Sequence, residues 1–237
     1  MILPRLIGHR GAAGLAPENT LASFRRAQAA GVAMVEFDVR LTADGIPIVF
    51  HDDEMERTTN GHGPAAALTL AAIKRLDAGS WFGPAFAGEP VATLAEVLEL
   101  CRALGLAVNM EIKPDRGREA ATAHAALTLA ASLGLETPPL VSSFERSCLE
   151  VACNLFPAWP RSLLAEHLPE DWRDQAMDLG CICVALDQRH LTPVQVTTVR
   201  REGLAVLAYT VNDPARAAAL WEAGATGIFS DFPDLGS

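Results

Sequence analysis

The sequence predicts an α/β protein with a mostly parallel sheet, and its 237 residues fit a single (β/α) barrel. Helical stretches repeatedly end in glycine and lead straight into short β-branched runs, which is typical of alternating helices and strands. Half of the residues are hydrophobic, so the chain can bury a sizeable core. Alanine is abundant and aromatic residues make up only 6%, which suits many closely packed helices.

The predicted helices carry recognisable start and stop signals. Thr93 and Glu96 have the spacing of a capping box, and Asp213 stands before Pro214 as expected at a first helical turn. Glycine just beyond a helix end takes a positive φ at no steric cost. The glycines predicted to do so are Gly31, Gly105, Gly134, Gly180, Gly203 and Gly224.

Nine segments are predicted as strands. They are Leu6–His9, Met34–Leu41, Ile46–His51, Ala107–Lys113, Leu140–Ser143, Ser162–Ala165, Ile182–Leu186, Ala205–Val211 and Gly227–Ser230. An eight-stranded barrel has no place for a ninth strand, so one candidate is misread or lies outside the ring. The dipeptide Asp44-Gly45 joins the second and third candidates as a hairpin, with no helix between them.

The stretch Asp52–Pro90 interrupts the alternation of helices and strands. It lacks a clear strand, is rich in Gly and Pro, and contains Trp81-Phe82-Gly83-Pro84. We interpret it as a small insertion after the third strand, at about residues 53–90, over one mouth of the barrel. The sequence has no low-complexity segment, repeat or linker, so residues 1–237 are predicted to form a single domain.

The net charge of the chain argues against some classes of binding partner. The net charge of −10 disfavours binding to nucleic acid and to anionic bilayers, and no apolar stretch is long enough for stable membrane insertion. The N-terminus reaches the first candidate strand without room for a signal peptide. The five cysteines are interpreted as free thiols of a reduced compartment, with Cys181 and Cys183 on opposite faces of a strand. We therefore expect a cytoplasmic enzyme.

Carboxylates occur where a buried barrel strand should be apolar. In the second candidate strand, the period of two places Val35, Phe37 and Val39 on one face. Glu36 and Asp38 then share the opposite face, which we expect to point into the barrel.

Other polar residues follow the same logic. Glu111 and Lys113 are expected to point inward from the fourth candidate strand. His9 and His51 lie at the ends of the first and third candidates, and counting outward from the hairpin turn brings His51 roughly opposite Asp38. Active sites of barrel enzymes lie at the carboxyl ends of the strands, so these groups are expected to converge.

Buried carboxylates need a cation or basic partners. Glu36, Asp38 and Glu111 suit a hard divalent ion such as Mg²⁺ or Ca²⁺, with Mn²⁺ as an alternative. Simpler interpretations stay open, because the first two could line a half-exposed edge strand and Glu111 could form an ion pair with Lys113. We interpret Pro17-Glu18-Asn19-Thr20 as a loop and helix cap.

These motifs, taken in order, resemble those of the glycerophosphodiester phosphodiesterases. They are His9-Arg10-Gly11, Pro17-Glu18-Asn19-Thr20, Glu36-Phe37-Asp38-Val39, Asp44-Gly45, His51-Asp52 and Glu111-Ile112-Lys113. The segments Asp77–Phe82, Ser142–Phe144, Tyr209–Asn212 and Gly227–Asp231 are also similar to that family. Each motif alone is weak, but the ordered set is specific and covers nearly the whole chain.

The resemblance implies a TIM-type (β/α)8 barrel with a small insertion after the third strand. It implies that Glu36, Asp38 and Glu111 bind the metal and that His9 and His51 form the acid–base pair. Arg10 and Lys113 would bind phosphate. Phe82 and Tyr209 are candidates for the leaving-group pocket, and Tyr209 stands where the family often has Trp.

The implied reaction is hydrolysis of a small-molecule glycerophosphodiester to sn-glycerol 3-phosphate and an alcohol. His9 is the hypothetical base and His51 the acid, and the reverse assignment stays open, as does attack by water or through a cyclic phosphate. Alternatives are a lysophospholipase D-type phosphodiesterase, a metal-dependent barrel lyase or aldolase, and a non-catalytic barrel scaffold. Neither the head group nor the oligomeric state is predicted.

Overall fold

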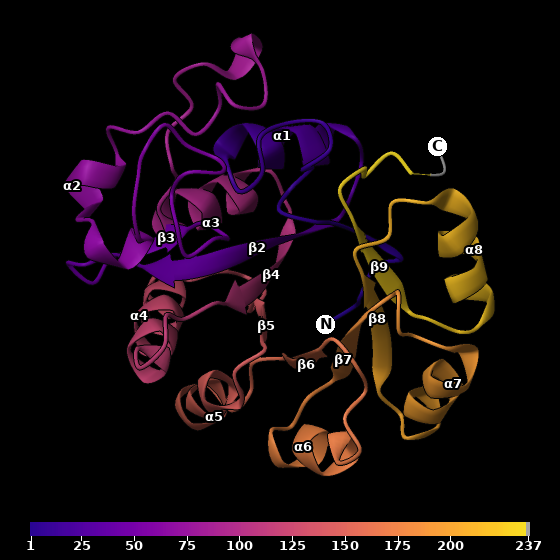
Figure 1. The fold of residues 1–237 in the computed structure, drawn as a ribbon. Coiled ribbons are helices and arrows are strands. Elements are labelled where there is room, and N and C mark those ends of the chain that lie inside the picture. Colours follow the sequence, from indigo (N-terminus) through magenta and orange to yellow (C-terminus); the bar gives the residue numbers. More distant parts are fainter. Residues whose placement is uncertain (236–237) are drawn as a thin grey trace.

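The computed structural model describes residues 1–235 as a closed barrel surrounded by helices. Eight parallel strands form the ring in the order β1-β9-β8-β7-β6-β5-β4-β2, and pairing of β1 with β2 closes it. Figure 1 shows the helices on the outside of this ring. The predicted TIM barrel is confirmed. The strands are β1 (Leu6–Gly8), β2 (Met34–Leu41), β3 (Pro47–Val49), β4 (Ala107–Ile112), β5 (Leu140–Ser143), β6 (Arg161–Ala165), β7 (Cys183–Asp187), β8 (Ala205–Tyr209) and β9 (Gly227–Ser230).

The strand β3 lies outside the ring. It pairs antiparallel with β2, and Val39 lies opposite Val49. The connection turns at Asp44 and Gly45, and Gly45 has a φ of 80°, in the region that favours glycine. The predicted hairpin is therefore confirmed, and it accounts for the ninth candidate strand.

The structure describes eight helices. They are α1 (Leu21–Ala29), α2 (Leu70–Ile73), α3 (Leu94–Ala103), α4 (Glu119–Ser132), α5 (Arg146–Leu155), α6 (Trp172–Asp178), α7 (Pro193–Arg201) and α8 (Pro214–Glu222). Six of these eight helices are followed by a predicted glycine, and α3 and α8 also begin at their predicted signals. All six predicted glycines have positive φ. Thr93 and Glu96 form the capping box of α3, and Asp213 caps α8. Within residues 1–235, none of the helices is long and apolar enough to cross a membrane.

Two layers of apolar side chains stabilise the barrel. The larger layer lies between strands and helices and includes Val35, Phe37 and Val39 of β2. The smaller layer fills the barrel interior and includes Met34, the first residue of β2. Since side chains alternate along a strand, the inward-facing residues after Met34 are Glu36 and Asp38. The interior therefore changes from apolar to polar toward the carboxyl end of β2.

Residues 52–90 form the insertion after β3. They contain α2 and two short 3₁₀ turns, Ala65–Ala67 and Pro84–Phe86, and no strand. A separate small core joins the insertion to the hairpin. It consists of Ile48, Phe50, Met55, Ala65, Ile73, Ala78 and Val91. The insertion, at the upper left of Figure 1, thus rests on β3, and its first residue, Asp52, lies next to the polar end of the barrel.

All five cysteines are free thiols, and Cys101, Cys148, Cys181 and Cys183 are buried. Cys181 belongs to the layer under the helices and Cys183 to the barrel interior, so the two point to opposite faces as predicted. Burial raises the pKa of Cys183 to about 12, which keeps this thiol protonated at neutral pH.

Candidate active site

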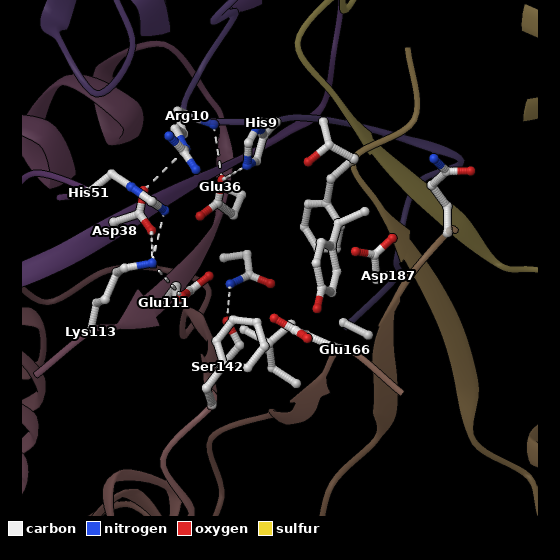
Figure 2. Close-up of a pocket in the computed structure, with 18 of the residues that line it drawn as sticks. His9, Arg10, Glu36, Asp38, His51, Glu111, Lys113, Ser142, Glu166 and Asp187 are labelled. Atoms are coloured by element: carbon white, nitrogen blue, oxygen red, sulfur yellow. Dashed lines mark hydrogen bonds and ion pairs between the residues drawn. The ribbon is translucent and has the colours of Figure 1, made fainter. Parts of the chain in front are cut away.

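A cavity of about 580 Å³ opens at the carboxyl ends of the barrel strands. Eight of the predicted functional residues line it. They are His9, Arg10, Glu36, Asp38, His51, Glu111, Lys113 and Tyr209. Figure 2 shows the histidines, the two cationic side chains and the three carboxylates on one side of the cavity, with Glu166 and Asp187 on the opposite side. Barrel enzymes carry their active sites at this end, so the cavity is the candidate active site.

A tight turn after β1 points His9 and Arg10 into the cavity. A Cβ on Gly8 would lie 2.1 Å from the carbonyl oxygen of Gly11, and a Cβ on Gly11 would lie 2.5 Å from Oγ of Ser23. Both positions therefore require glycine. Arg10 has a φ of 47°, which side-chain-bearing residues rarely adopt. The hydroxyl of Ser23 donates to the carbonyl oxygen of Arg10 at 2.8 Å and holds this backbone in place.

Three carboxylates form the centre of the site. Glu36, Asp38 and Glu111 each place an oxygen within 4.8 Å of the other two. Their side chains are only 6%, 2% and 13% exposed, respectively. Glu36 accepts from the backbone amide of Arg10 at 2.9 Å, and Asp38 accepts from the side-chain amide of Asn19 at 2.9 Å. These hydrogen bonds hold two of the three carboxylates in position.

Burial and mutual repulsion set the charge state of this cluster. Burial raises the pKa of Glu36 well above its ordinary value, and the charges of Asp38 and Glu111 add to the effect. Burial, followed by the charge of Asp38, raises the pKa of Glu111 to about 8. For Asp38, burial acts in the same direction, but Arg10 and neighbouring cationic side chains outweigh it and lower its pKa.

The cluster fits a divalent cation. Oε1 of Glu111 and Oδ1 of Asn109, which also lines the cavity, are buried without a hydrogen-bond partner in the part of the chain that the structure describes. An unpaired buried acceptor is costly, and a bound cation would satisfy the carboxylate oxygen and offset the repulsion within the cluster. Carboxylate and amide oxygens are the ligands that Mg²⁺ and Ca²⁺ prefer.

His9 is held by a carboxylate that follows the last strand of the barrel. Its Nδ1 lies 2.6 Å from Oδ1 of Asp231, and its Nε2 lies 3.9 Å from Oε2 of Glu36. Burial tends to raise the pKa of Asp231, but the hydrogen bond and charge of His9, together with the hydrogen bond from Asn212 and the charge of Arg10, outweigh burial and lower this pKa. An ionised carboxylate at Nδ1 fixes the tautomer with its hydrogen there. Nε2 is then available to exchange a proton with a ligand.

His51 has a similar arrangement. Its Nδ1 lies 2.5 Å from Oδ1 of Asp52, and its Nε2 lies 2.8 Å from Nζ of Lys113. Nε of Arg40 donates to the carbonyl oxygen of His51 at 2.8 Å and fixes the backbone there. Burial lowers the pKa of His51, and the charges of Arg10 and Lys113 lower it further although Asp38 opposes them. The ring is therefore favoured in its neutral form.

Arg10 and Lys113 place positive charge beside the carboxylates. Nε of Arg10 lies 3.5 Å from Oδ2 of Asp38. Nζ of Lys113 lies 4.0 Å from Oδ1 of Asp38 and 3.9 Å from Oε1 of Glu111. Both cationic side chains line the cavity, so a phosphate group next to the three carboxylates would be within their reach.

The two candidates for the leaving-group pocket lie in different places. Tyr209 ends β8 and lines the cavity, and its hydroxyl donates to the carbonyl oxygen of Ala165 at 2.9 Å. Phe82 lies in the insertion and packs edge-on against Trp81 and Phe86. Among the described residues, the lining of the cavity includes Tyr209 but not Phe82. The structure thus brings only Tyr209 to the site.

Three residues of the site received no role from the sequence. The sequence offers Asn19 or Thr20 as the cap of α1, and Thr20 is the cap, whereas the side-chain amide of Asn19 donates to Asp38. Asp52 could have been found from its position next to a candidate catalytic histidine. Asp231 is 222 positions from its partner His9, and no local sequence pattern reports a contact of that kind.

The chain is similar to known proteins over nearly its whole length. Residues 9–235 match the Glycerophosphoryl diester phosphodiesterase family. A glycerophosphodiester phosphodiesterase of Caldanaerobacter subterraneus subsp. tengcongensis is 34% identical over 97% of this chain and 94% of its own length. One from Bacillus subtilis is 35% identical over 97% of this chain and 84% of its own length.

A solved structure with a bound ligand is also similar. It is a phosphodiesterase of Oleispira antarctica in complex with the product sn-glycerol-3-phosphate. It is 39% identical to this chain, with a TM-score of 0.96, and the match covers 98% of this chain and 94% of the other. The chain forms the barrel, brings together the carboxylate cluster and its two histidines, and matches the family over residues 9–235. The chain therefore belongs to the glycerophosphoryl diester phosphodiesterase family.

Proposed function

We propose that this protein hydrolyses glycerophosphodiesters to sn-glycerol 3-phosphate and an alcohol. The observation that carries the proposal is the cluster of Glu36, Asp38 and Glu111 beside two histidines that are each bound to a carboxylate. The similarity to a phosphodiesterase that binds sn-glycerol-3-phosphate supports the choice of substrate class.

Glu36, Asp38 and Glu111 would hold the cation, which is Mg²⁺ or Ca²⁺ in this proposal, with Mn²⁺ as an alternative. When bound, such an ion neutralises charge on a phosphodiester and on the oxygens that become more negative during the reaction. Arg10 and Lys113 contribute to the same end, because their side chains reach the cavity beside the carboxylates. Together they would orient the diester and reduce its repulsion of an incoming nucleophile.

His9 is proposed as the base that takes a proton from the nucleophile. Its carboxylate partner Asp231 leaves Nε2 unprotonated in the neutral ring and stabilises the ring after protonation. His51 is proposed as the acid that protonates the departing alkoxide. In the absence of substrate its Nε2 faces the ammonium of Lys113, whose charge helps to lower the pKa of the ring. Lys113 would turn to the phosphate when substrate binds. Nε2 would then take up a proton from solvent, and the ring, protonated on both nitrogens, would deliver that proton to the departing alkoxide.

Tyr209 is proposed to contact the leaving alcohol, because it lines the cavity and lies opposite Asp187 in the β7–β8 pairing, and Figure 2 shows Asp187 across the cavity from the carboxylate cluster. The net charge of −10 disfavours approach to anionic bilayers, so deacylated diesters are the proposed substrates.

A coupled assay for glycerol 3-phosphate tests the proposal. Purified protein is incubated with glycerophosphocholine and Mg²⁺ or Ca²⁺, with and without EDTA. Product is expected only with metal, and it should be lost in His9→Ala but kept in His124→Ala, whose histidine is exposed on α4. If no glycerophosphodiester is hydrolysed with Mg²⁺, Ca²⁺ or Mn²⁺, the proposed function is wrong. Turnover of lysophospholipids alone would instead favour a lysophospholipase D-type activity.

A further inference from the structure

We propose that Arg57, in the insertion, is a positioning residue that aligns both His51 and Arg10 for the reaction. The inference rests on the proposed hydrolysis, since it concerns two residues assigned roles in it. Through this role of Arg57, the insertion would contribute to catalysis by way of hydrogen bonds.

The guanidinium of Arg57 binds two carboxylates at once. Its Nε donates to Oδ2 of Asp52 at 2.5 Å, and its Nη2 donates to Oδ1 of Asp52 at 2.9 Å. Its Nη1 and Nη2 donate to the two carboxylate oxygens of Glu18 at 2.8 and 2.7 Å. Only the planar fork of an arginine offers this many donors in fixed directions.

Each of these carboxylates has a second partner in the active site. Asp52 accepts at Oδ1 from Nδ1 of His51 at 2.5 Å. Glu18 accepts at Oε1 from Nη1 of Arg10 at 2.7 Å. Two short chains of hydrogen bonds therefore begin at Arg57, and they end at the proposed acid and at a proposed phosphate-binding residue.

The network differs from an ordinary surface ion pair, which contributes little. The side chain of Arg57 is 45% exposed, but those of Glu18 and Asp52 are only 10% and 24% exposed. Burial tends to raise the pKa of Asp52, yet hydrogen bonds from Arg57 and His51 lower it to about 2. Asp52 thus stays an ionised acceptor, as a carboxylate that orients a histidine must be.

Loss of the guanidinium would free both carboxylates to rotate. Asp52 would then hold His51 less firmly, and Glu18 would hold Arg10 less firmly. A residue that orients a metal-binding or catalytic side chain by a hydrogen bond typically contributes about 10–100-fold to activity. We therefore expect Arg57→Ala to lower kcat/KM by about 10–100-fold.

Steady-state kinetics distinguish the effects of the two chains of hydrogen bonds. Asp52→Asn is expected mainly to lower kcat, Glu18→Gln mainly to raise KM, and Arg57→Ala to do both. Because Arg57 acts on kcat through Asp52, the double variant Asp52→Asn/Arg57→Ala should have nearly the kcat of Asp52→Asn alone. Free guanidinium should partly restore Arg57→Ala, since the exposed site admits it, and Arg57→Lys should retain an intermediate activity.

The matched control is Arg75→Ala. Arg75 lies in the same insertion, and its Nη1 donates to the carbonyl oxygen of Ala71 in α2. This variant should keep the activity of the unchanged protein. If Arg57→Ala behaves like the control, or if its effect on kcat is fully additive with that of Asp52→Asn, the inference is wrong.

The hydrogen bond between Nδ1 of His51 and Asp52 provides a readout that needs neither substrate nor metal. Proton NMR, with the His51→Gln variant for assignment, should show a downfield, slowly exchanging Nδ1 proton in the unchanged protein and faster exchange of that proton with water in Arg57→Ala. Identical exchange in both proteins would overturn the inference even if the protein hydrolysed no glycerophosphodiester. Hydrolysis that is absent while the exchange changes as expected would contradict the proposed function alone.

Discussion

Nζ of Lys113 lies 2.8 Å from Nε2 of His51, so a cationic side chain faces the ring nitrogen that is proposed to deliver a proton. Lys113 is one of the groups that lower the pKa of His51. The contact therefore links the charge of Lys113, which is proposed to bind phosphate, to the protonation state of His51.

Replacing Lys113 with Gln should change both substrate binding and pH dependence. KM should rise by roughly 10–100-fold, which corresponds to losing about 1.5–3 kcal/mol for a hydrogen bond to a charged group. The pKa of His51 should rise, and if His51 is the acid, the alkaline limb of the kcat/KM profile should move to higher pH. Movement of the acidic limb instead would assign His51 as the base. Lys74→Gln, whose lysine pairs with Glu96, is the control and should change neither.

Replacing Asp231 with Asn should lower kcat by about 10–100-fold, as expected when the group that orients a catalytic side chain is lost. The amide cannot stabilise the protonated ring of His9 as a carboxylate does. Asp213→Asn is the control, because Asn caps a helix as well as Asp and α8 should be unaffected. Equal activity of the two variants would exclude a role for Asp231 in catalysis.

Metal should stabilise the protein more at high pH than at low pH. The pKa of Glu111 is raised to about 8 in the folded protein without metal, against about 4.3 in an unfolded chain. The folded state therefore binds the extra proton between these values, so the stability due to this group is present below the lower value and lost as pH rises through about 8. A cation replaces the proton and reverses that loss.

Thermal unfolding at pH 6 and pH 8.5, with EDTA or with Mg²⁺ or Ca²⁺, measures this effect. The increase in Tm caused by metal should be larger at pH 8.5, and it should be much reduced in Glu111→Gln. A metal-induced increase that is larger at pH 6 would contradict the proposed ligand set.

Phe24 should contribute strongly to stability. It is fully buried in α1 and packs edge-on against Phe37 of β2, with 5.8 Å between the ring centroids. Phe24→Ala should lower the free energy of unfolding by about 3–5 kcal/mol, because it leaves a cavity between helix and barrel. Val194→Ala, at a position that is 75% exposed, should change it by less than about 0.5 kcal/mol. Chemical denaturation of both variants tests this difference.

Much of the fold could be predicted because local chemistry determines it. Glycine is required where a helix ends with positive φ, and the period of two separates Glu36 and Asp38 from Val35, Phe37 and Val39. The Asp44-Gly45 turn was sufficient to identify the hairpin, although only the pairing of β1 with β2 decides which strand lies outside the ring.

The remainder of the site depends on contacts between distant segments. Asp231 meets His9 only after β9 pairs with β1, and Arg57 meets Glu18 only after the insertion folds onto the hairpin. The leaving-group assignment shows the same limit. In the sequence, Phe82 and Tyr209 look equally suitable for the leaving-group pocket. The fold of the insertion packs Phe82 against Phe86, whereas Tyr209 lines the cavity.

The place of Asp231 has a consequence for how activity arises during synthesis. A chain still emerging from the ribosome completes β2 and β4, and with them Glu36, Asp38 and Glu111, long before β9 is made. It could bind metal early, but His9 would lack its oriented partner until the final strand closed the ring. We therefore expect full catalytic power to arise only once β9 is in place, well after the carboxylate cluster can form.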